Sequence, residues 1–258
     1  MTETLQSFEQ LLNIMSELRQ KCPWDSKQTF DSLRTLTIEE TYELADAIVN
    51  NDRPNIEKEL GDLLLHIVFY AKMGSETGDF DIKSVIDKLC EKLIYRHPHI
   101  FADTKANSSE QVSKNWEELK LKEKGGNRTV LSGVPASLPA LIKAYRVQDK
   151  ARNVGFDWEE KEQVWDKVRE EFDELQAEIQ HLDHQKTEEE FGDLLFAVVN
   201  AGRLYGIDPE NALEKTNLKF IRRFNYLEQK IKDNGLNLKE LNLNEMNKIW
   251  NEAKESGL

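Results

Sequence analysis

The sequence of 258 residues predicts an all-α protein made of two similar helical domains. Apolar residues recur at intervals of three and four along most of the chain, for example at Leu5, Phe8 and Leu12, and this is the period of an amphipathic helix. Runs of β-branched residues with alternating polarity are missing, and most Gly and Pro residues stand between the helical segments, which argues against strands. The third observation is that one half of the chain repeats the acidic motifs of the other.

A single long segment interrupts the helical pattern. The residues KGGNRTVLSGVPASLP, which end at Pro139, contain three glycines and two prolines, the residue types that punctuate local structure. Two domains of ordinary size also account for a chain of this length. We therefore expect an N-terminal helical domain at residues 1–124, a linker at 125–139 and a C-terminal helical domain at 140–258.

The two domains share two acidic motifs in the same order. Glu39-Glu40-x-x-Glu43 and Glu59-x-Gly61-Asp62 stand before the linker, and Glu170-Glu171-x-x-Glu174 and Glu190-x-Gly192-Asp193 stand after it. Glu40 and Glu59 are 19 positions apart, as are Glu171 and Glu190. The flanking matches are Trp24-Asp25 with Phe156-Asp157, Lys88, Lys92 and Arg96 with Lys215, Lys219 and Arg223, and Trp116 with Trp250. We interpret the chain as a tandem duplication.

The spacing of the acidic residues predicts a metal site. On a helix, residues three or four apart share one face, so each motif forms a carboxylate pair. In the first repeat the pairs are Glu40 with Glu43 and Glu59 with Asp62. If two neighbouring helices bring four carboxylates together, each raises the pKa of the others, and a divalent cation is the usual compensation. Ligation by oxygen alone favours a hard ion, Mg²⁺ first and Mn²⁺ second.

Helix capping is the alternative explanation for these acidic residues. The segments Thr37-x-x-Glu40 and Thr187-x-x-Glu190 both match a capping box. The residue equivalent to the threonine in the other repeat is Val168 in one case and Ile56 in the other. Each capping box is therefore present in one repeat only, and capping does not explain why the carboxylate pairs occur in both.

Three residues near the motifs are given structural roles. Gly costs roughly 1 kcal/mol relative to Ala inside a helix, so Gly61 and Gly192 are expected to allow the close approach of a neighbouring helix. His66 stands four residues after Asp62, but its counterpart is Ala197. We expect His66 to be a core histidine rather than a metal ligand.

A stripe of basic residues follows each pair of acidic motifs. It consists of Lys215, Lys219, Arg222 and Arg223 in the second repeat and of Lys88, Lys92 and Arg96 in the first. Such a stripe is either a solvated face or, beside a metal, a site for a polyphosphate. Trp116 and Trp250 stand late in each repeat, where they either stack on a base or close the core.

Composition restricts the class of partner. The formal net charge is −13 and 32% of residues are charged, so nucleic acid is not an expected partner. No run approaches the ~20 apolar residues that span a bilayer, and the N-terminus lacks a signal-sequence pattern, so we expect a cytoplasmic protein with no membrane partner. Cys22 and Cys90 match no disulfide or zinc pattern and are expected to be reduced thiols.

Several segments of the sequence resemble the MazG family of nucleoside triphosphate pyrophosphohydrolases. They are CPWDSKQTFDSLRTLTIEETYELADAI, ELGDLLLHIVFYAKM, RHPHIF, VPASLPAL and VGFDW, and the resemblance covers nearly the whole chain. It implies tandem helical bundle domains and a homodimer. It also implies Mg²⁺-dependent cleavage of canonical or altered NTPs and dNTPs between the α and β phosphates, in a house-cleaning or regulatory role for the nucleotide pool.

The resemblance also implies site residues, with the second repeat as the main catalytic one. The implied metal ligands are Glu171, Glu174, Glu190 and Asp193, and the first repeat keeps Glu40, Glu43, Glu59 and Asp62. The implied nucleotide contacts are Lys167, Val168, Arg169, Glu170, Glu171, Lys186, Thr187, Glu188, Glu189, Asp193, Lys219, Phe220, Ile221, Arg222, Arg223 and Trp250, with weaker counterparts at Glu39, Lys92, Arg96 and Trp116. Because the first repeat lacks none of the ligands, the sequence does not decide whether that copy is active.

The expected mechanism is in-line attack of water on the α-phosphorus. The catalytic residues are then the four ligands of the second repeat together with Glu170, which is assigned to positioning the water. Lys219 and Arg223 are expected to neutralise the leaving pyrophosphate. Three alternatives remain: a non-catalytic sensor of NTP and Mg²⁺, a helical scaffold with solubilising acidic faces, and a di-iron protein, which normally needs ExxH pairs that neither motif has.

Overall fold

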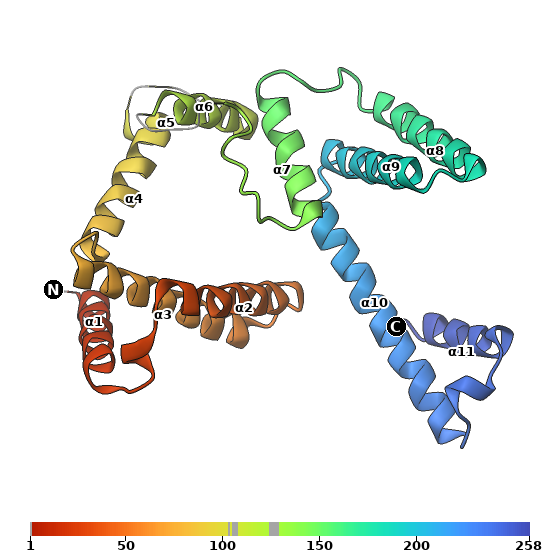
Figure 1. The fold of residues 1–258 in the computed structure, drawn as a ribbon, viewed down its shortest axis with the longest axis horizontal. Helices are drawn as coiled ribbons and strands as arrows, with labels where there is room; N and C mark the ends of the chain where they lie inside the picture. Colours follow the sequence, from red (N-terminus) through yellow and green to blue (C-terminus); the bar gives the residue numbers. More distant parts are fainter. Residues whose placement is uncertain (1, 103, 105–107, 124–128) are drawn as a thin grey trace. The chain divides into compact units, whose positions relative to one another are not determined.

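The computed structural model describes residues 2–102, 104, 108–123 and 129–258, and every regular element in these ranges is a helix (Figure 1). In chain order the elements are α1 (Glu3–Lys21), η1 (Asp25–Lys27), α2 (Phe30–Val49), α3 (Arg53–Thr77), α4 (Ile82–Arg96), α5 (Pro98–Phe101), α6 (Ser109–Lys122), α7 (Ala140–Asn153), α8 (Gln163–His181), α9 (His184–Leu204), α10 (Pro209–Asp233), η2 (Leu238–Glu240) and α11 (Leu243–Glu255). The all-α prediction is confirmed.

The chain divides into two compact units, Met1–Ser108 and Ser109–Leu258. This division assigns α6 to the second unit, whereas the repeat pattern assigns it to the first domain. Of the expected linker, residues 129–139 contain turns and no helix, and residues 125–128 lie outside the described residues. The domain limits 1–124 and 140–258 stay a prediction.

In each unit, two long helices pack together and carry the acidic motifs. α2 packs against α3 in the first unit, and α8 packs against α9 in the second. α3 and α9 both begin after an aspartate N-cap, Asp52 or Asp183, whose side chain accepts a hydrogen bond from the backbone N–H three residues later. The N-cap fixes where each helix begins and therefore where its acidic motif lies.

The turn that joins each helix pair is repeated as well. Asn51, at φ 54°, and Leu182, at φ 59°, are the non-glycine residues with positive φ in the described part of the chain. Each directly precedes the aspartate N-cap of the next helix. The two residues are 131 positions apart, which is also the offset between Glu40 and Glu171. The duplication therefore extends to the backbone conformation of the turn.

The first unit has a closed apolar core between α1, α2 and α3. Its members are at most 4% exposed and are Met15, Leu33, Val68, Phe69 and Met73. His66 lies near them at 7% exposure, and burial lowers its pKa. Its Nδ1 lies 2.8 Å from the Thr37 hydroxyl, which is also 2.7 Å from the Tyr70 hydroxyl. The prediction of a core histidine is confirmed.

An ion pair joins α1 to the end of α3. Arg19 Nη2 lies 2.7 Å from Glu76 Oε2, and Arg19 Nε donates to Glu76 Oε1 at 3.1 Å. Arg19 Nη1 also donates to the main-chain carbonyls of Asp25 and Gln28, on the loop that contains η1. The hydrogen bond from Arg19 lowers the pKa of Glu76.

The second unit places α7 against α9 and anchors the loop between α7 and α8 with a buried ion pair. Arg203 on α9 is 6% exposed and donates to both carboxylate oxygens of Asp157, at 3.1 and 2.5 Å. Asn200 Oδ1 accepts two further hydrogen bonds from Arg203, at 3.0 and 2.8 Å. Because breaking such a pair leaves a buried charge unmatched, it fixes the loop on α9.

α10 packs mainly against α11, and it also contacts α7 and α9. Leu227 and Ile231 on α10 and Ala253 on α11 are buried. In the part of the chain that the structure describes, none of the helices is long and apolar enough to cross a bilayer.

Candidate metal centre and adjoining cavity

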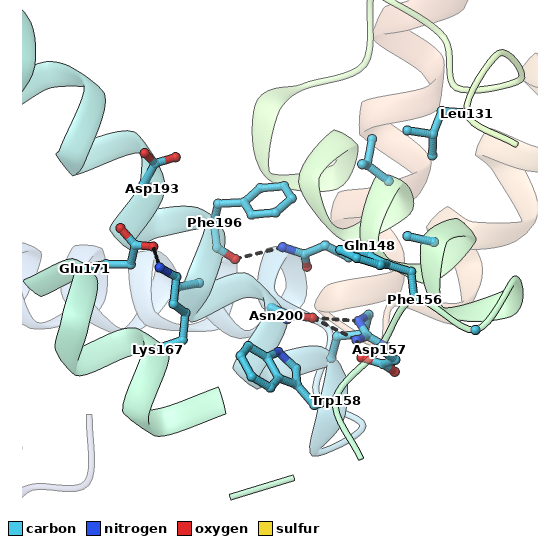
Figure 2. A pocket seen from close by; sticks show the side chains of 15 residues that line it. Leu131, Gln148, Phe156, Asp157, Trp158, Lys167, Glu171, Asp193, Phe196 and Asn200 are labelled. Carbon is cyan, nitrogen blue, oxygen red and sulfur yellow. Dashed lines mark hydrogen bonds and ion pairs between the residues drawn. The ribbon is translucent and has the colours of Figure 1, made fainter. Parts of the chain in front are cut away.

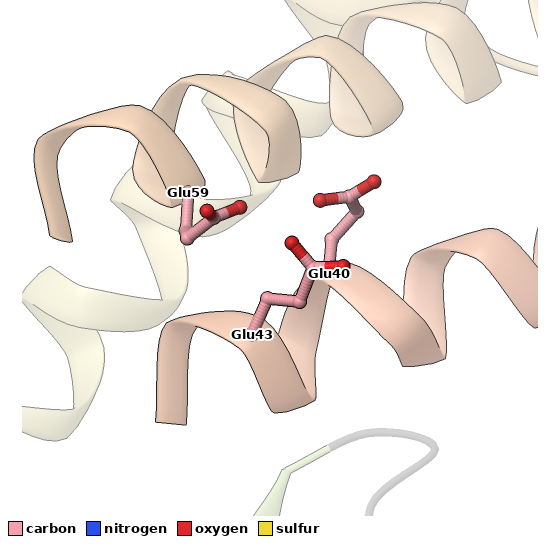
Figure 3. A group of neighbouring side chains, drawn as sticks. All are labelled: Glu40, Glu43 and Glu59. Carbon is pink, nitrogen blue, oxygen red and sulfur yellow. The ribbon is translucent and has the colours of Figure 1, made fainter. Parts of the chain in front are cut away.

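The first repeat brings three of its four predicted ligands into one cluster. Glu40 and Glu43 on α2 and Glu59 on α3 each offer a carboxylate oxygen, and these atoms lie within 4.8 Å of one another (Figure 3). Glu59 is 4% exposed, and its Oε2 has no hydrogen-bond partner among the described residues. A buried carboxylate oxygen without a partner is unfavourable, and a cation between the helices relieves it.

An ammonium group stands in this first cluster. Lys58 Nζ lies 2.7 Å from Glu59 Oε1, 3.5 Å from Asp62 Oδ2 and 3.9 Å from Glu43 Oε2. The hydrogen bond to Glu59 raises the pKa of Lys58, so the side chain is charged at neutral pH. A metal ion in the first repeat must therefore compete with Lys58.

The second repeat forms the equivalent cluster. Glu171 and Glu174 on α8 and Glu190 on α9 offer oxygens that lie within 4.8 Å of one another, and Glu171 is 7% exposed. Lys167 Nζ lies 2.8 Å from Glu171 Oε1. The counterpart of Lys58 is Glu189, so here the ammonium group comes from the same helix as Glu171.

The fourth predicted ligand of each repeat lies beside its cluster rather than in it. Asp62 is 3.5 Å from Lys58 Nζ, and Asp193 lines a cavity together with Glu171. Asp62 and Asp193 therefore stand next to the cation position, and their role as ligands stays a prediction.

Burial, and then the charge of neighbouring carboxylates, changes the acidity of both clusters. Burial, followed by the charge of Asp62, raises the pKa of Glu40. Burial, followed by the charge of Glu174, raises the pKa of Glu190. Carboxylates that repel one another in this way are stabilised by a divalent cation.

The structure excludes the capping explanation for both acidic motifs. The Thr37 hydroxyl donates to Leu33 O at 2.9 Å, and the Thr187 hydroxyl donates to Asp183 O at 2.7 Å. Both threonines thus lie within helices, where α2 is capped by Thr29 and α9 by Asp183. The carboxylate of Glu40 therefore has no part in starting α2.

The packing role predicted for the two glycines is wrong. A Cβ atom built on Gly61 or Gly192 meets no other atom within 4 Å among the described residues, and both glycines are exposed. No neighbouring helix therefore approaches closely enough to require glycine at either position. The structure of this chain gives no reason for the two glycines.

A cavity of about 680 Å³ adjoins the second cluster, within the second unit. Figure 2 shows Glu171, Asp193 and Lys167 at one end and Phe156 toward the other, with Trp158 in the lower middle of the view; Gln148 also lines the cavity. Between the two ends the wall includes Phe196, Ala197 and Asn200 of α9. Ligand sites commonly have this size and a mainly apolar lining with a few polar groups.

The predicted nucleotide contacts on α8 and α9 lie around the second cluster. Lys167 lines the cavity, and Glu170 is held 2.7 Å from its ammonium group. Arg169 is exposed and pairs with Asp166 at 2.8 Å. The other members of this group are Val168 on α8 and Lys186, Thr187, Glu188 and Glu189 in the first turns of α9.

The predicted contacts on α10 and α11 form a separate group. Phe220 lies 5.0 Å from Trp250 between ring centroids, and Arg223 stands over the Trp250 ring at 6.0 Å. Arg223 Nε donates to Leu258 O at 2.6 Å. Lys219, Ile221 and Arg222 are exposed. In the described residues, no hydrogen bond, ion pair or ring contact joins this group to the carboxylates of α8 and α9.

The weaker contacts predicted in the first repeat are divided between elements. Glu39 is exposed on α2, and Lys92 and Arg96 lie on α4. Trp116 lies on α6, which belongs to the second unit, and Lys120 stands over its ring at 3.8 Å. Substrate binding by these residues stays a prediction.

The family model for the MazG nucleotide pyrophosphohydrolase domain matches residues 28–101 and again residues 159–227. The chain belongs to the MazG family. The nucleoside triphosphate pyrophosphohydrolase of Escherichia coli strain K12 is 43% identical over 257 residues, which cover 97% of this chain and 98% of that protein. The nucleoside triphosphate pyrophosphohydrolase/pyrophosphatase MazG of Thermotoga maritima is 44% identical over 250 residues, 96% of this chain and 95% of that protein. The uncharacterized protein YabN of Bacillus subtilis is 46% identical over 253 residues, 96% of this chain and 52% of YabN.

Each MazG match contains one complete set of acidic motifs, whereas α7 and α11 lie outside both matches. Sequence reasoning missed Gln148 of α7, which is 6% exposed and lines the cavity. A signal for it exists, because Leu141, Ala144, Gln148 and Ala151 are spaced as one helix face. A glutamine within an otherwise apolar stripe marks a buried polar group.

Proposed function

We propose that the second repeat of this MazG chain binds a nucleoside triphosphate with Mg²⁺ and carries out the hydrolysis. The chain is a nucleoside triphosphate pyrophosphohydrolase, which converts the triphosphate to the monophosphate and pyrophosphate. The observation that carries the choice of repeat is that Glu171 belongs both to the carboxylate cluster and to the wall of the cavity. The substrates are canonical or altered NTPs and dNTPs, and the role is to clean or regulate the nucleotide pool.

The first repeat offers less support for catalysis. In the described residues, Lys58 pairs with three of its four acidic residues, whereas Lys167 pairs with Glu171 alone among the four of the second repeat. A cation in the first repeat must therefore displace more ion pairs. His66 and Phe69, which correspond to Ala197 and Asn200, are buried in or beside the core. We therefore propose that this repeat is not the main catalytic one.

The proposed cofactor is Mg²⁺, with Mn²⁺ as the second choice, held by Glu171, Glu174, Glu190 and Asp193. The donor set is made of carboxylate oxygens, which suits a hard divalent ion. Bound there, the ion supplies neutralisation of phosphate charge and a more acidic water molecule. Loss of any one ligand is then expected to weaken both binding and turnover.

Two residues of α8 are assigned to the reaction itself. Glu170 is adjacent to Glu171 and more than half exposed, and we assign it to orienting the attacking water and accepting its proton. Hydrogen bonds to Glu170 and then Glu171 raise the pKa of Lys167, so its ammonium group stays charged and is suited to a phosphate oxygen. The pyrophosphate then leaves in line with the attacking water.

Lys219, Arg222, Arg223 and Trp250 are proposed to contact the nucleotide from a second subunit. In the described residues no hydrogen bond, ion pair or ring contact joins them to the carboxylates of α8 and α9 of their own chain. Both groups of helices expose large apolar side chains, among them Phe172, Phe191 and Leu195 on α8 and α9 and Leu213, Phe220 and Ile221 on α10, each about half exposed. Burying such faces between two copies accounts for them, so we propose a homodimer.

The chain contains its own matched control for the catalytic assignment. Purified protein with Glu171→Ala is compared with Glu40→Ala, the same substitution at the equivalent position of the first repeat. Pyrophosphate and monophosphate are measured by chromatography over a panel of NTPs and dNTPs with Mg²⁺. We expect Glu171→Ala to lower kcat/KM by at least about 100-fold, as loss of a direct metal ligand or transition-state contact does, and Glu40→Ala to retain most activity.

The opposite result assigns catalysis to the first repeat. A wild-type protein that binds NTP and Mg²⁺ by calorimetry but releases no pyrophosphate instead supports the sensor alternative. A protein that binds neither supports the scaffold alternative.

A further inference from the structure

The end of the cavity away from the carboxylates has the features of a nucleobase site. Phe156 lies at this end and is 83% exposed, and Trp158, which also lines the cavity, is 40% exposed, so the cavity wall includes two accessible aromatic rings. Planar bases stack on such rings regardless of their identity. The carboxylates at the opposite end of the same cavity are the place for the phosphates (Figure 2).

Gln148 lines this cavity and carries a buried acceptor. Its amide nitrogen donates to the main-chain oxygen of Phe196 at 2.8 Å, and because a carbonyl can only accept, the orientation of the amide is fixed. Gln148 Oε1 therefore points away from Phe196. This oxygen is buried and has no hydrogen-bond partner among the described residues. A buried acceptor without a partner is rare in proteins and needs an explanation.

Asn200 presents a donor nearby. Its Oδ1 accepts from Nε and Nη2 of Arg203, which Asp157 holds in place. The amide nitrogen of Asn200 therefore faces away from Arg203, and no hydrogen bond from it is found in the described residues. Asn200 also lines the cavity. The wall thus offers one acceptor and one donor on fixed side chains.

We propose that the nucleobase of the substrate occupies this end of the cavity and that Gln148 Oε1 accepts a hydrogen bond from an N–H group on the base edge. Asn200 donates to the neighbouring acceptor of the same edge. Each common base carries an N–H donor beside an acceptor on its pairing edge, so the site selects bases that have this pair over bases that lack the donor. This inference rests on the proposed function of the second repeat.

The first repeat provides an internal comparison. Alignment through Trp24-Asp25 and Phe156-Asp157 places Ser16 at the position of Gln148 and Met15 at that of Val147. Met15 is 1% exposed and packs with Phe69, the counterpart of Asn200, in the closed core. The acceptor, the donor and the space for a base are therefore features of the second repeat.

The test compares substrates that differ only in the base. Wild-type protein and Gln148→Leu, which keeps a similar volume without the acceptor, are assayed with ATP, with purine riboside triphosphate, which lacks the amino group, and with ribose 5-triphosphate, which lacks the base. Wild type is expected to prefer ATP over purine riboside triphosphate by at least about tenfold in kcat/KM, because the site is built to bond an N–H donor. In Gln148→Leu this preference falls to within about twofold, because the rate with ATP falls more than the rates with the other two substrates.

Each other outcome contradicts the inference or the proposed function separately. Equal wild-type rates with ATP and purine riboside triphosphate overturn the inference. This comparison needs no variant, so it remains decisive even if Gln148→Leu misfolds. An equal loss on all three substrates, with an unchanged circular dichroism spectrum, assigns Gln148 a structural role and also overturns it. A wild-type protein that hydrolyses none of the three contradicts the proposed function instead.

Discussion

Leu182 adopts at φ 59° the left-handed backbone that Asn51 adopts at φ 54° in the other repeat. Asn tolerates this conformation because its short polar side chain bonds locally, whereas Leu pays a steric penalty of about 1 kcal/mol or more. Leu182 is also 89% exposed, so its side chain gains little from packing. The same turn conformation is therefore unstrained with Asn51 in the first repeat and strained with Leu182 in the second.

Leu182→Asn is expected to stabilise the second unit by about 1 kcal/mol, and Asn51→Leu to destabilise the first by a similar amount. Urea unfolding followed by circular dichroism measures both changes. If Leu182→Asn lowers the free energy of unfolding, the exposed leucine has a partner that the strain argument omits.

Lys58 is expected to limit metal binding by the first repeat. In a Glu171→Ala background, which disables the second site, Lys58→Met should tighten Mn²⁺ binding by about tenfold, since a competing positive charge is removed from the carboxylates. Titration calorimetry measures the affinity. The reciprocal change, Glu189→Lys in the otherwise natural chain, places an ammonium group at the equivalent position of the second repeat and should weaken Mg²⁺ binding there. If the metal affinity is unchanged in both variants, the Lys58 ammonium group does not compete measurably with the cation.

The Arg19–Glu76 pair predicts a pH-dependent contribution to stability. Glu76 has a pKa below its ordinary value of 4.5 in the folded protein because Arg19 bonds the carboxylate. The stabilisation is therefore complete above pH 4.5 and is lost as the pH falls through the lower folded value. Glu76→Gln should cost about 1 kcal/mol at pH 7, a modest value because the carboxylate is partly screened by solvent.

The difference between wild type and Glu76→Gln should shrink below pH 4.5 and disappear in stronger acid. Unfolding curves at several pH values measure it. A difference that stays constant with pH would show that the charge of Glu76 is not what stabilises the contact.

The proposed homodimer predicts complementation between two inactive variants. Glu171→Ala removes a carboxylate of α8, and Arg223→Ala removes a cation of α10. If each site combines α8 from one subunit with α10 from the other, a mixed dimer keeps one intact site of two. Co-expression in equal amounts should then restore about one quarter of wild-type activity. Sedimentation analysis provides the control for dimer formation, and a mixture that stays inactive places both groups in one subunit.

The sequence was sufficient for features that depend on local spacing. The helical period and the acidic motifs predicted the helix pairs α2–α3 and α8–α9, and the structure brings three carboxylates of each pair together. It was insufficient where the answer depends on packing between elements remote in sequence. The cavity exists because α7 packs on α9 while the Asp157–Arg203 pair holds the intervening loop. The spacing of residues along the sequence does not predict these contacts.

The two glycines also show that sequence spacing does not predict packing. Gly61 and Gly192 recur at equal positions, and the low helix propensity of glycine suggested that a neighbouring helix approaches closely. The space beside them is open in this chain. Recurrence therefore identified positions under a shared constraint without identifying the constraint.

The exchange of Phe69 for Asn200 between the repeats has a thermodynamic consequence. In the first repeat the aromatic ring fills its position, so the helices there gain the full free energy of core packing. In the second repeat the same position leaves space, and an unfilled cavity lowers the stability of the fold around it. The second repeat therefore has the less completely filled interior, and we expect its stability to rise when a ligand fills the cavity.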